Sequence, residues 1–204
     1  ASGHSARIEA AVDWNVDDLF SAPEQRKLDP FTMYALVSTR EALSDAGLGD
    51  VRELPESERE AYGVILGTGI GGITGILEQQ AVYVDRGARR VSPHFVPRIM
   101  VNAVSGQVAI ANGMLGTVFT TSSACASSGH AIGMAFLSIR SGESELVVTG
   151  GAESSTTPLA LAGFCSAKAV STPQIGDQTL AVRITSRDHD FYVDRMYVRS
   201  GHNL

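Results

Sequence analysis

The sequence predicts an α/β fold in which helices are layered on a largely parallel β-sheet. Short apolar runs with strand composition occur at residues 61–66, 117–122 and 145–149, and segments with helical spacing stand between them. Because a helical segment separates each strand from the next, successive strands can return in the same direction. The chain has 204 residues, 44% of them hydrophobic, which suits one large domain or a piece of a larger one.

Charge and cysteine content narrow the classes of partner and compartment. The net charge is −6 with dispersed basic residues, so we expect no nucleic-acid partner. No apolar run approaches the ~20 residues of a membrane-spanning helix, so we expect no membrane contact. The two cysteines, Cys125 and Cys165, cannot form a disulfide framework, and we expect no signal peptide before them. We therefore expect a reducing location, either the cytoplasm or an organelle matrix such as that of a mitochondrion or plastid.

The first third of the chain contains one clear helix. Residues 1–22 show no long periodic pattern and could contribute a short strand at 8–12. A helix should begin at Asp29-Pro30, because Asp caps the first N–H groups and Pro fits the first helical position, and it should end at Gly47. The charged residues 53–60 are predicted to form a surface loop.

A buried strand at residues 61–66 runs into a glycine cluster at residues 67–72. Such a loop can cradle the phosphates of a dinucleotide at a helix N-terminus. Its spacing is not GxGxxG followed by an acidic ribose ligand at the expected distance. The glycines are better explained by tight turning or by close approach of another segment. We therefore expect no dinucleotide or other cofactor. We also expect no metal ion.

The later segments continue the alternation. A helix is predicted at residues 73–86, and residues 92–97 should be extended because two prolines disfavour helix before them. A second helix should span residues 102–111 and end at Gly113. A buried strand is predicted at residues 145–149, and a short helix or turn at 157–163.

Cys125 stands where the strand-like run gives way to a helix at residues 126–139, with Gly142 as its stop signal. Unpaired N–H groups and the dipole of a helix N-terminus favour a negative charge, which would increase the nucleophilic thiolate fraction. Free cysteines are also commonly buried as small hydrophobic residues. The residues alone leave both interpretations of Cys125 open, whereas Cys165 is predicted to be a buried thiol.

The helix after Cys125 contains two glycines, Gly129 and Gly133, that each cost about 1 kcal/mol relative to alanine. This cost predicts a central, buried helix against which another backbone packs closely. His130 lies five residues beyond Cys125, a step that turns it away from the thiol, so we expect a structural role for it.

Several motifs in this order resemble the β-ketoacyl-acyl-carrier-protein synthases of fatty-acid synthesis, and most of all the type II elongating enzymes. The resemblance covers approximately residues 16–172. The motifs are Gly-Thr-Gly-Ile-Gly-Gly at residues 67–72, Arg-Val-Ser-Pro-His-Phe-Val-Pro at 90–97, Ser-Ala-Cys-Ala-Ser-Ser-Gly-His-Ala-Ile-Gly at 123–133, Gly-Gly-Ala-Glu at 150–153 and Leu-Ala-Gly-Phe-Cys-Ser-Ala-Lys-Ala-Val-Ser-Thr at 161–172.

The resemblance implies a thiolase-like layered α/β/α fold, of which this chain holds the N-terminal half only, incomplete at both ends. Residues 1–172 would form a partial N-terminal β-ketoacyl synthase domain, and residues 173–204 a divergent tail. The first strand and Gly-rich turn of the family have no counterpart before residue 8. The second half of the family, with its two catalytic histidines and its lysine, has none after residue 172.

The resemblance also implies the chemistry. Cys125 would accept an acyl chain from a carrier protein as a thioester, which then undergoes decarboxylative Claisen condensation with malonyl-carrier protein. The backbone N–H of Cys125 would be one oxyanion-hole donor. Ile70, Phe95 and Phe164 stand at positions that line the family's acyl tunnel, although the residues alone, without the resemblance, favour ordinary core packing.

The implied partners are acyl carrier protein and a second copy of the chain. Arg26 and Lys27 match a basic patch that touches the acidic carrier, or they are a solvated charge pair. Family members are homodimers in which the strand at residues 117–122 pairs across a two-fold axis. We expect that this chain alone does not complete the condensation. The alternative is a non-catalytic remnant that binds a carrier protein or pairs with a complete subunit.

Overall fold

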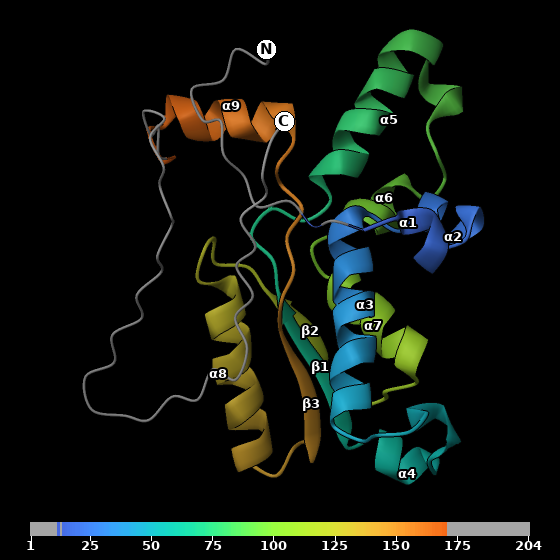
Figure 1. Cartoon of the computed structure of the whole chain (residues 1–204), viewed down its shortest axis with the longest axis vertical. Helices are drawn as coiled ribbons and strands as arrows, with labels where there is room; N and C mark the ends of the chain where they lie inside the picture. The colour runs from blue at the N-terminus through green and yellow to red at the C-terminus, as the bar shows by residue number, and fades with distance from the viewer. Residues whose placement is uncertain (1–11, 13, 171–204) are drawn as a thin grey trace. The chain divides into compact units, whose positions relative to one another are not determined.

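The computed structural model in Figure 1 describes residue 12 and residues 14–170. The chain divides into two compact units, one made of Asp17–Thr157 and the other of Ala1–Val16 with Pro158–Leu204. The tail predicted at residues 173–204, and all but residue 12 of the short strand predicted at 8–12, lie outside the described residues.

The larger unit is built on a parallel sheet of three strands, β1 (Tyr62–Gly67), β2 (Val118–Thr121) and β3 (Leu146–Gly151), in the order β2-β1-β3. This arrangement confirms the α/β prediction. The register pairs Gly67 with Thr121 on one side and with Gly151 on the other, so the carboxyl ends of the strands are level. Strand β1 is buried along nearly its whole length. The prediction of a buried strand near residues 145–149 is wrong, because β3 is an edge strand and is only partly covered.

The four long helices of this unit match the predicted ranges to within about two residues at either end. They are α3 (Pro30–Asp45), α5 (Ile73–Arg86), α7 (Ala103–Asn112) and α8 (Ser127–Arg140). Asp29 precedes α3 as its N-cap residue, but its side chain makes no capping hydrogen bond and accepts from the Gly75 N–H, so the predicted capping by Asp29 is wrong. Gly47, Gly113 and Gly142 follow α3, α7 and α8 with φ of +68°, +69° and +79°. Glycine adopts this left-handed conformation without the penalty of a Cβ atom, so it ends a helix readily.

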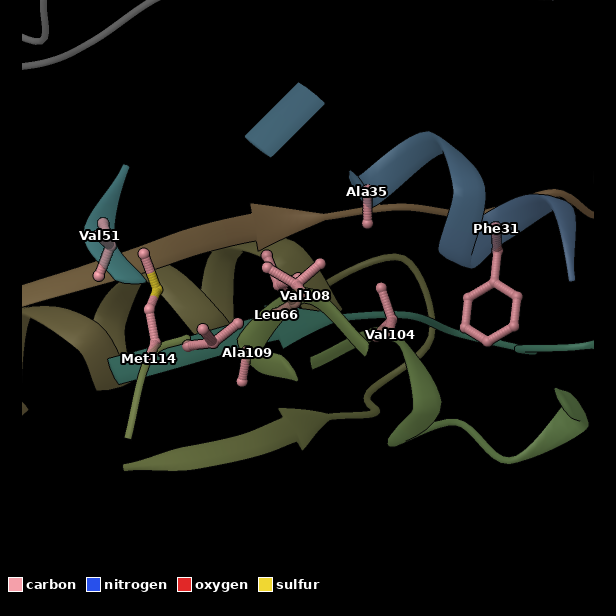
Figure 2. Packing of buried hydrophobic residues seen from close by; sticks show 9 residues of the cluster. Phe31, Ala35, Val51, Leu66, Val104, Val108, Ala109 and Met114 are labelled. Atoms are coloured by element: carbon pink, nitrogen blue, oxygen red, sulfur yellow. The ribbon is translucent and has the colours of Figure 1, made fainter. Parts of the chain in front are cut away.

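Helices cover both faces of the sheet, as Figure 1 shows. Helices α3 and α7 pack against each other, and α7 lies on β1 and β2; α8 packs on the other face. Successive residues of a strand point to opposite faces, so Val64 and Leu66 join the α3–α7 side while Ile65 faces α8. Figure 2 shows the larger core, in which Phe31 and Ala35 of α3 meet residues of β1 and α7. The layers are therefore α/β/α.

The remaining helical segments are short. In the larger unit they are α2 (Ala22–Lys27), η1 (Val51–Glu53), α4 (Glu56–Arg59), η2 (Ala88–Arg90) and α6 (Phe95–Ile99), with α1 (Val16–Leu19) at its start. Helix α9 (Pro158–Ser166) belongs to the other unit and confirms the short helix predicted near residues 157–163. Among the described helices, none is both long and apolar enough to cross a membrane.

Two segments differ from their predictions. Residues 53–60 contain the helical turn α4, in which Glu56 and Glu58 lie in the first turn, where acidic side chains stabilise the exposed N–H groups. The extended segment predicted at residues 92–97 is wrong, because α6 begins at Phe95. Pro97 is the third residue of α6, and the first N–H groups of a helix have no intrahelical acceptor, so its missing N–H removes no hydrogen bond.

The prediction that α8 is a central, buried helix is also wrong for the described part of the chain. Only one stripe of α8 is buried, formed by Ser127, Ala131, Ala135 and Ser138. The side chains of Ile132, Phe136 and Leu137 on the other side are 53%, 58% and 53% exposed. A Cβ atom added to Gly129 or Gly133 would meet no atom within 4 Å. The alanines, and not the glycines, bring α8 close to the sheet.

Candidate active site

The candidate site lies at the carboxyl edge of the sheet, where each strand is followed by one of the sequence motifs. The glycine loop, residues 67–72, follows β1; the nucleophile turn, residues 123–126, follows β2; and Glu153 follows β3. Ligands of open α/β sheets bind outside the carboxyl ends of the strands. The parallel topology therefore brings together three segments that are far apart in sequence.

The nucleophile turn holds Cys125 immediately before α8. The Ala126 N–H donates to the Ser123 carbonyl at 3.1 Å, and the Ser127 N–H donates to the Ala124 carbonyl at 3.1 Å. Ala124 has a φ of +51°, a left-handed conformation that non-glycine residues seldom adopt. The Cys125 side chain is a free, exposed thiol, which does not fit the alternative of a buried structural cysteine. Cys165 is half-buried in α9, partly in line with its prediction.

The buried hydroxyl of Ser127 fixes the nucleophile turn, a role that the sequence analysis missed. Its Oγ accepts from the Ser123 N–H at 2.9 Å and lies within donating distance of the carbonyls of Ala124, at 2.7 Å, and Thr68, at 3.2 Å. Serine is preferred at the start of helices because its hydroxyl satisfies nearby backbone groups. Ser127 therefore connects the nucleophile turn to the glycine loop.

Glu153 fixes the glycine loop from the end of β3, and its role was also missed. Its Oε2 accepts from the N–H groups of Gly69 and Ile70, both at 2.8 Å, and from the Thr68 hydroxyl at 3.3 Å. The Ser122 hydroxyl in turn donates to the Gly69 carbonyl at 3.4 Å. A glutamate two residues after a strand that ends in two glycines was the available signal. The glycine loop, and Ile70 with it, is thereby held against the nucleophile turn.

Close packing explains the glycines at this edge. A Cβ atom on Gly67 would collide with the backbone of Ser127, and one on Gly72 would collide with Ile99. Gly71 has a φ of +78°. The glycine loop thus serves close approach of neighbouring backbone, as predicted, and its interior side is filled by protein atoms.

The three residues predicted to line an acyl tunnel lie in different elements. Ile70 is 39% exposed beside the nucleophile turn. Phe95 is half-buried at the start of α6, and this helix reaches the glycine loop through Ile99, whose carbonyl accepts from the Gly72 N–H at 3.2 Å. Phe164 lies on α9 in the other unit and is 41% exposed. Ile70 therefore lies in the loop that Glu153 and Ser122 hold, and Phe95 begins the helix that flanks this loop.

The predicted docking residues are exposed at the end of α2. Arg26 and Lys27 form its last turn, and within the described residues neither takes part in an ion pair. At the other end of α2, the Glu24 carboxylate accepts from the hydroxyl and the N–H of Ser21, and these bonds lower the pKa of Glu24. Both positive charges are thus available to an external anion.

A buried charge cluster lies beneath the start of α5. Burial raises the pKa of Asp29 from 3.8 to about 6, against the opposing effects of a 2.7 Å hydrogen bond from the Gly75 N–H and of the nearby Arg98. Arg98 lies 3.8 Å from Asp29 and forms an ion pair of 2.8 Å with Glu78. In the part of the chain that the structure describes, no three His, Cys, Asp or Glu side chains are placed to hold a metal ion.

Sequence comparisons agree with the motifs. The model of the β-ketoacyl synthase N-terminal domain matches residues 3–185. The chain is 38% identical over 182 residues to 3-oxoacyl-[acyl-carrier-protein] synthase 2 of Rhizobium meliloti (strain 1021), covering 88% of this chain and 42% of that protein. It is 39% identical over 173 residues to the enzyme of the same name from Vibrio harveyi, covering 84% and 41%. The chain thus spans about two fifths of the length of these relatives.

Solved structures share the fold. A β-ketoacyl synthase from Burkholderia phymatum STM815 matches with a TM-score of 0.63 at 27% identity, covering 81% of this chain and 38% of that one. The ketosynthase in a complex with a type II PKS acyl-carrier protein matches with a TM-score of 0.72 at 24% identity, covering 80% and 46%. The ordered motifs, the layered parallel fold and the matched family model together establish that the chain belongs to the β-ketoacyl synthase family, in its N-terminal domain.

Proposed function

We propose that this chain carries the acyl-accepting half of a 3-oxoacyl-[acyl-carrier-protein] synthase, with Cys125 as the nucleophile. The observation that carries the proposal is the exposed Cys125 thiol on a turn that three motifs hold at the carboxyl edge of the sheet. The names of the relatives supply the reaction class, since each is a 3-oxoacyl-[acyl-carrier-protein] synthase 2.

In the proposed first step, the Cys125 thiolate attacks the carbonyl carbon of an acyl thioester on the carrier protein. The tetrahedral oxyanion then collapses, the carrier thiolate leaves and takes up a proton, and the acyl chain remains as a thioester on Cys125. In the described part of the chain, the first-turn N–H groups of Ser128 and Gly129 have no protein acceptor. These groups and the dipole of α8 favour negative charge at the site. The Cys125 N–H would be one donor to the oxyanion.

The second step is decarboxylation of a malonyl thioester and attack of the resulting carbanion on the Cys125 thioester. This step needs donors that stabilise the enolate as it develops. We assign the step to the longer protein that the relatives represent, because this chain spans only about two fifths of their length. The chain alone should form the acyl-cysteine and yield no β-ketoacyl product.

The remaining roles follow from the same proposal. Ile70, Phe95 and Phe164 would supply apolar contacts to the acyl chain, and Arg26 and Lys27 would contact the acidic carrier protein. Two copies of the chain would pair along the edge of β2 that faces away from β1, which no other described strand covers. The sequence contains only two cysteines, too few for a disulfide framework, which favours a reducing compartment such as the cytoplasm.

Labelling with a cysteine-reactive acyl analogue, such as a chloromethyl ketone on an aliphatic tail, tests the nucleophile. We expect labelling of the wild-type chain and of Cys165→Ala, and none of Cys125→Ala. Equal labelling rates at the two cysteines would contradict the proposal and would favour the alternative, a non-catalytic remnant that binds a carrier protein.

A further inference from the structure

His130 contacts the nucleophile turn, although its position along α8 turns it away from Cys125. It is the fourth residue of α8, and its ring Nδ1 lies 2.6 Å from the Ser123 hydroxyl. Side chains on a helix lean toward its N-terminus, so a residue in the first turn covers the segment that precedes the helix. His130 therefore reaches back over the turn and meets Ser123, two residues before Cys125.

Ser123 is held at three of its atoms. Its N–H donates to Ser127 Oγ, its carbonyl accepts from the Ala126 N–H, and its side chain pairs with His130. It is also the residue that leads into Ala124, whose φ of +51° is intrinsically unfavourable. Such a conformation persists only where surrounding contacts determine it. Two of the three contacts come from the backbone and the buried Ser127; the third depends on His130 alone.

We propose that His130 is a positioning residue, which holds the nucleophile turn through the Ser123 hydroxyl and so presents the Cys125 thiol to the acyl thioester. This inference rests on the proposed function of Cys125 and adds to it a residue that acts without touching the substrate. Neutral His130 can accept from the Ser123 hydroxyl at Nδ1, and a ring protonated at Nδ1 can donate to it, so either form maintains the contact. The positioning role therefore requires a hydrogen-bonding atom at the position of Nδ1, and it does not require proton transfer.

Two amide substitutions separate positioning from proton transfer. An asparagine places its amide where Nδ1 stands and can still pair with Ser123, whereas a glutamine places its amide near the position of Nε2 and cannot without rearrangement. Both variants lack an imidazole. His130→Asn should therefore retain function, and His130→Gln should lose it together with His130→Ala.

The measurement is the rate of Cys125 acylation from an acyl thioester between pH 6 and 9, followed by intact-protein mass spectrometry. We expect His130→Ala, His130→Gln and Ser123→Ala each to slow acylation about tenfold, the size expected for losing one positioning hydrogen bond. His130→Asn should stay within about twofold of wild type at every pH. The double variant of Ser123→Ala and His130→Ala should be no slower than either single variant, since both remove the same contact.

Each other outcome has a definite meaning. If all four single variants react at the wild-type rate, His130 does not position the turn, and the proposed function stands. If His130→Asn is as slow as His130→Ala and the pH profile changes shape, a proton-transfer role replaces the positioning role. If wild-type Cys125 reacts no faster than Cys165, the proposed function fails and this inference fails with it. Thermal unfolding midpoints, measured by circular dichroism, identify any variant that is slow because it unfolds. If His130→Ala unfolds, the comparison of the acylation rates of His130→Asn and His130→Gln, which carry the same amide group, still tests the positioning role.

Discussion

Gly67 ends the central strand at the point where the first turn of α8 crosses it. A Cβ atom there would strike the backbone of Ser127 and Ser128, which cannot rotate out of the way as a long side chain can. The same edge carries Gly151, where a Cβ atom would collide with the Ser128 side chain. The approach of α8 to the strand ends, and with it the location of Cys125, therefore depends on residues without side chains.

We predict that Gly67→Ala lowers the free energy of unfolding by about 1–3 kcal/mol, the usual cost of forcing extra atoms into a packed site. The matched control is Gly129→Ala in α8, where the added methyl group meets open space. Because alanine is the better helix former by about 1 kcal/mol, this control should be neutral or stabilising. Urea unfolding of both variants measures the difference, and equal destabilisation would contradict the packing at Gly67.

Asp29 gives the chain a specific pH dependence. Burial raises the pKa of its carboxyl from 3.8 to about 6, so the folded chain holds this proton more tightly than the unfolded chain. The resulting stabilisation is complete below pH 3.8 and is lost as the pH rises to about 6. The side chain of Asp29→Asn cannot ionise, so this variant does not lose that stabilisation as the pH rises from 4 to 7. Over this range its free energy of unfolding should rise relative to that of wild type by at most about 3 kcal/mol, since one pKa unit corresponds to about 1.4 kcal/mol.

Urea unfolding at several pH values between 4 and 8 checks this prediction. Asp85→Asn removes the same charge from an exposed side chain and controls for net charge. Parallel stability curves for wild type and Asp29→Asn would show that the folded chain does not protonate Asp29 near pH 6.

Sequence reasoning could propose some residues of the candidate site and missed others for a physical reason. Cys125 could be proposed because the change from strand to helix composition surrounds it, a signal contained within about twenty residues. Ser127 and Glu153 were missed because their partners, Thr68 and Gly69, lie 59 and 84 residues away in sequence. A local pattern contains no information about such partners. His130 was assigned a structural role from helical spacing, and its contact with Ser123 became evident only from the path of the turn.

Helix α7 is joined to the sheet by a buried hydroxyl in addition to its apolar side chains. Ser105 is fully buried, and its Oγ lies 2.6 Å from the Thr120 hydroxyl, accepts from the Leu66 N–H at 3.2 Å and lies 2.8 Å from the Phe119 carbonyl. It therefore connects α7 to β1 and to β2 at once. Buried polar groups that lose their partner cost more than the hydrogen bond itself contributes.

We predict that Ser105→Ala lowers the free energy of unfolding by about 1–3 kcal/mol, because the backbone groups of Leu66 and Phe119 lose a partner in a buried site. Ser38→Ala, at an exposed position of α3, is the matched control and should change stability by a few tenths of a kcal/mol at most. Chemical denaturation compares the two. A loss as small as that of the control would mean that water or a neighbouring group replaces the hydroxyl.

Among the elements, those with a signal at each end were predicted best. Helix α5 lies between Gly72 and Gly87 and has the bounds that its periodicity indicates. Helix α6 was missed because prolines usually oppose helix, and only its start at Phe95 makes Pro97 a tolerated first-turn residue. The face of α8 that packs on the sheet could not be predicted from the sequence. Small and large apolar residues occur on several sides of this helix, so no single apolar face is evident.

At the level of the whole molecule, the proposed homodimer depends on the edge of β2 that no other strand among the described residues covers. The Thr117 carbonyl accepts from Val64 of β1, and the Thr121 carbonyl accepts from Thr68, directly after β1. The backbone groups of Val118 and Thr120 therefore point away from β1 by the alternation of a strand. Outward-facing backbone N–H and C=O groups along an edge strand can form hydrogen bonds with the same strand of a second copy of the chain. We predict that the chain elutes at twice its mass of 21.5 kDa, and that Val118→Pro, which removes an outward N–H, elutes as a monomer.

Light scattering coupled to size exclusion measures these masses. The control is Val84→Lys in α5, because the Val84 side chain is 73% exposed. A second proline variant at Val84 would break α5 and is therefore not a suitable control. Val84→Lys should leave the measured mass unchanged. A wild-type chain that runs as a monomer would contradict pairing through β2.

The central claim is that Cys125 accepts an acyl chain from acyl carrier protein. Incubation of the chain with an acyl-loaded carrier protein, followed by peptide mass spectrometry, tests this directly. We predict one acyl group on the peptide that contains Cys125, removable by hydroxylamine as a thioester should be, and absent from Cys125→Ala. Transfer of the acyl group to Cys165 instead, or no transfer to the wild-type chain, would contradict the claim.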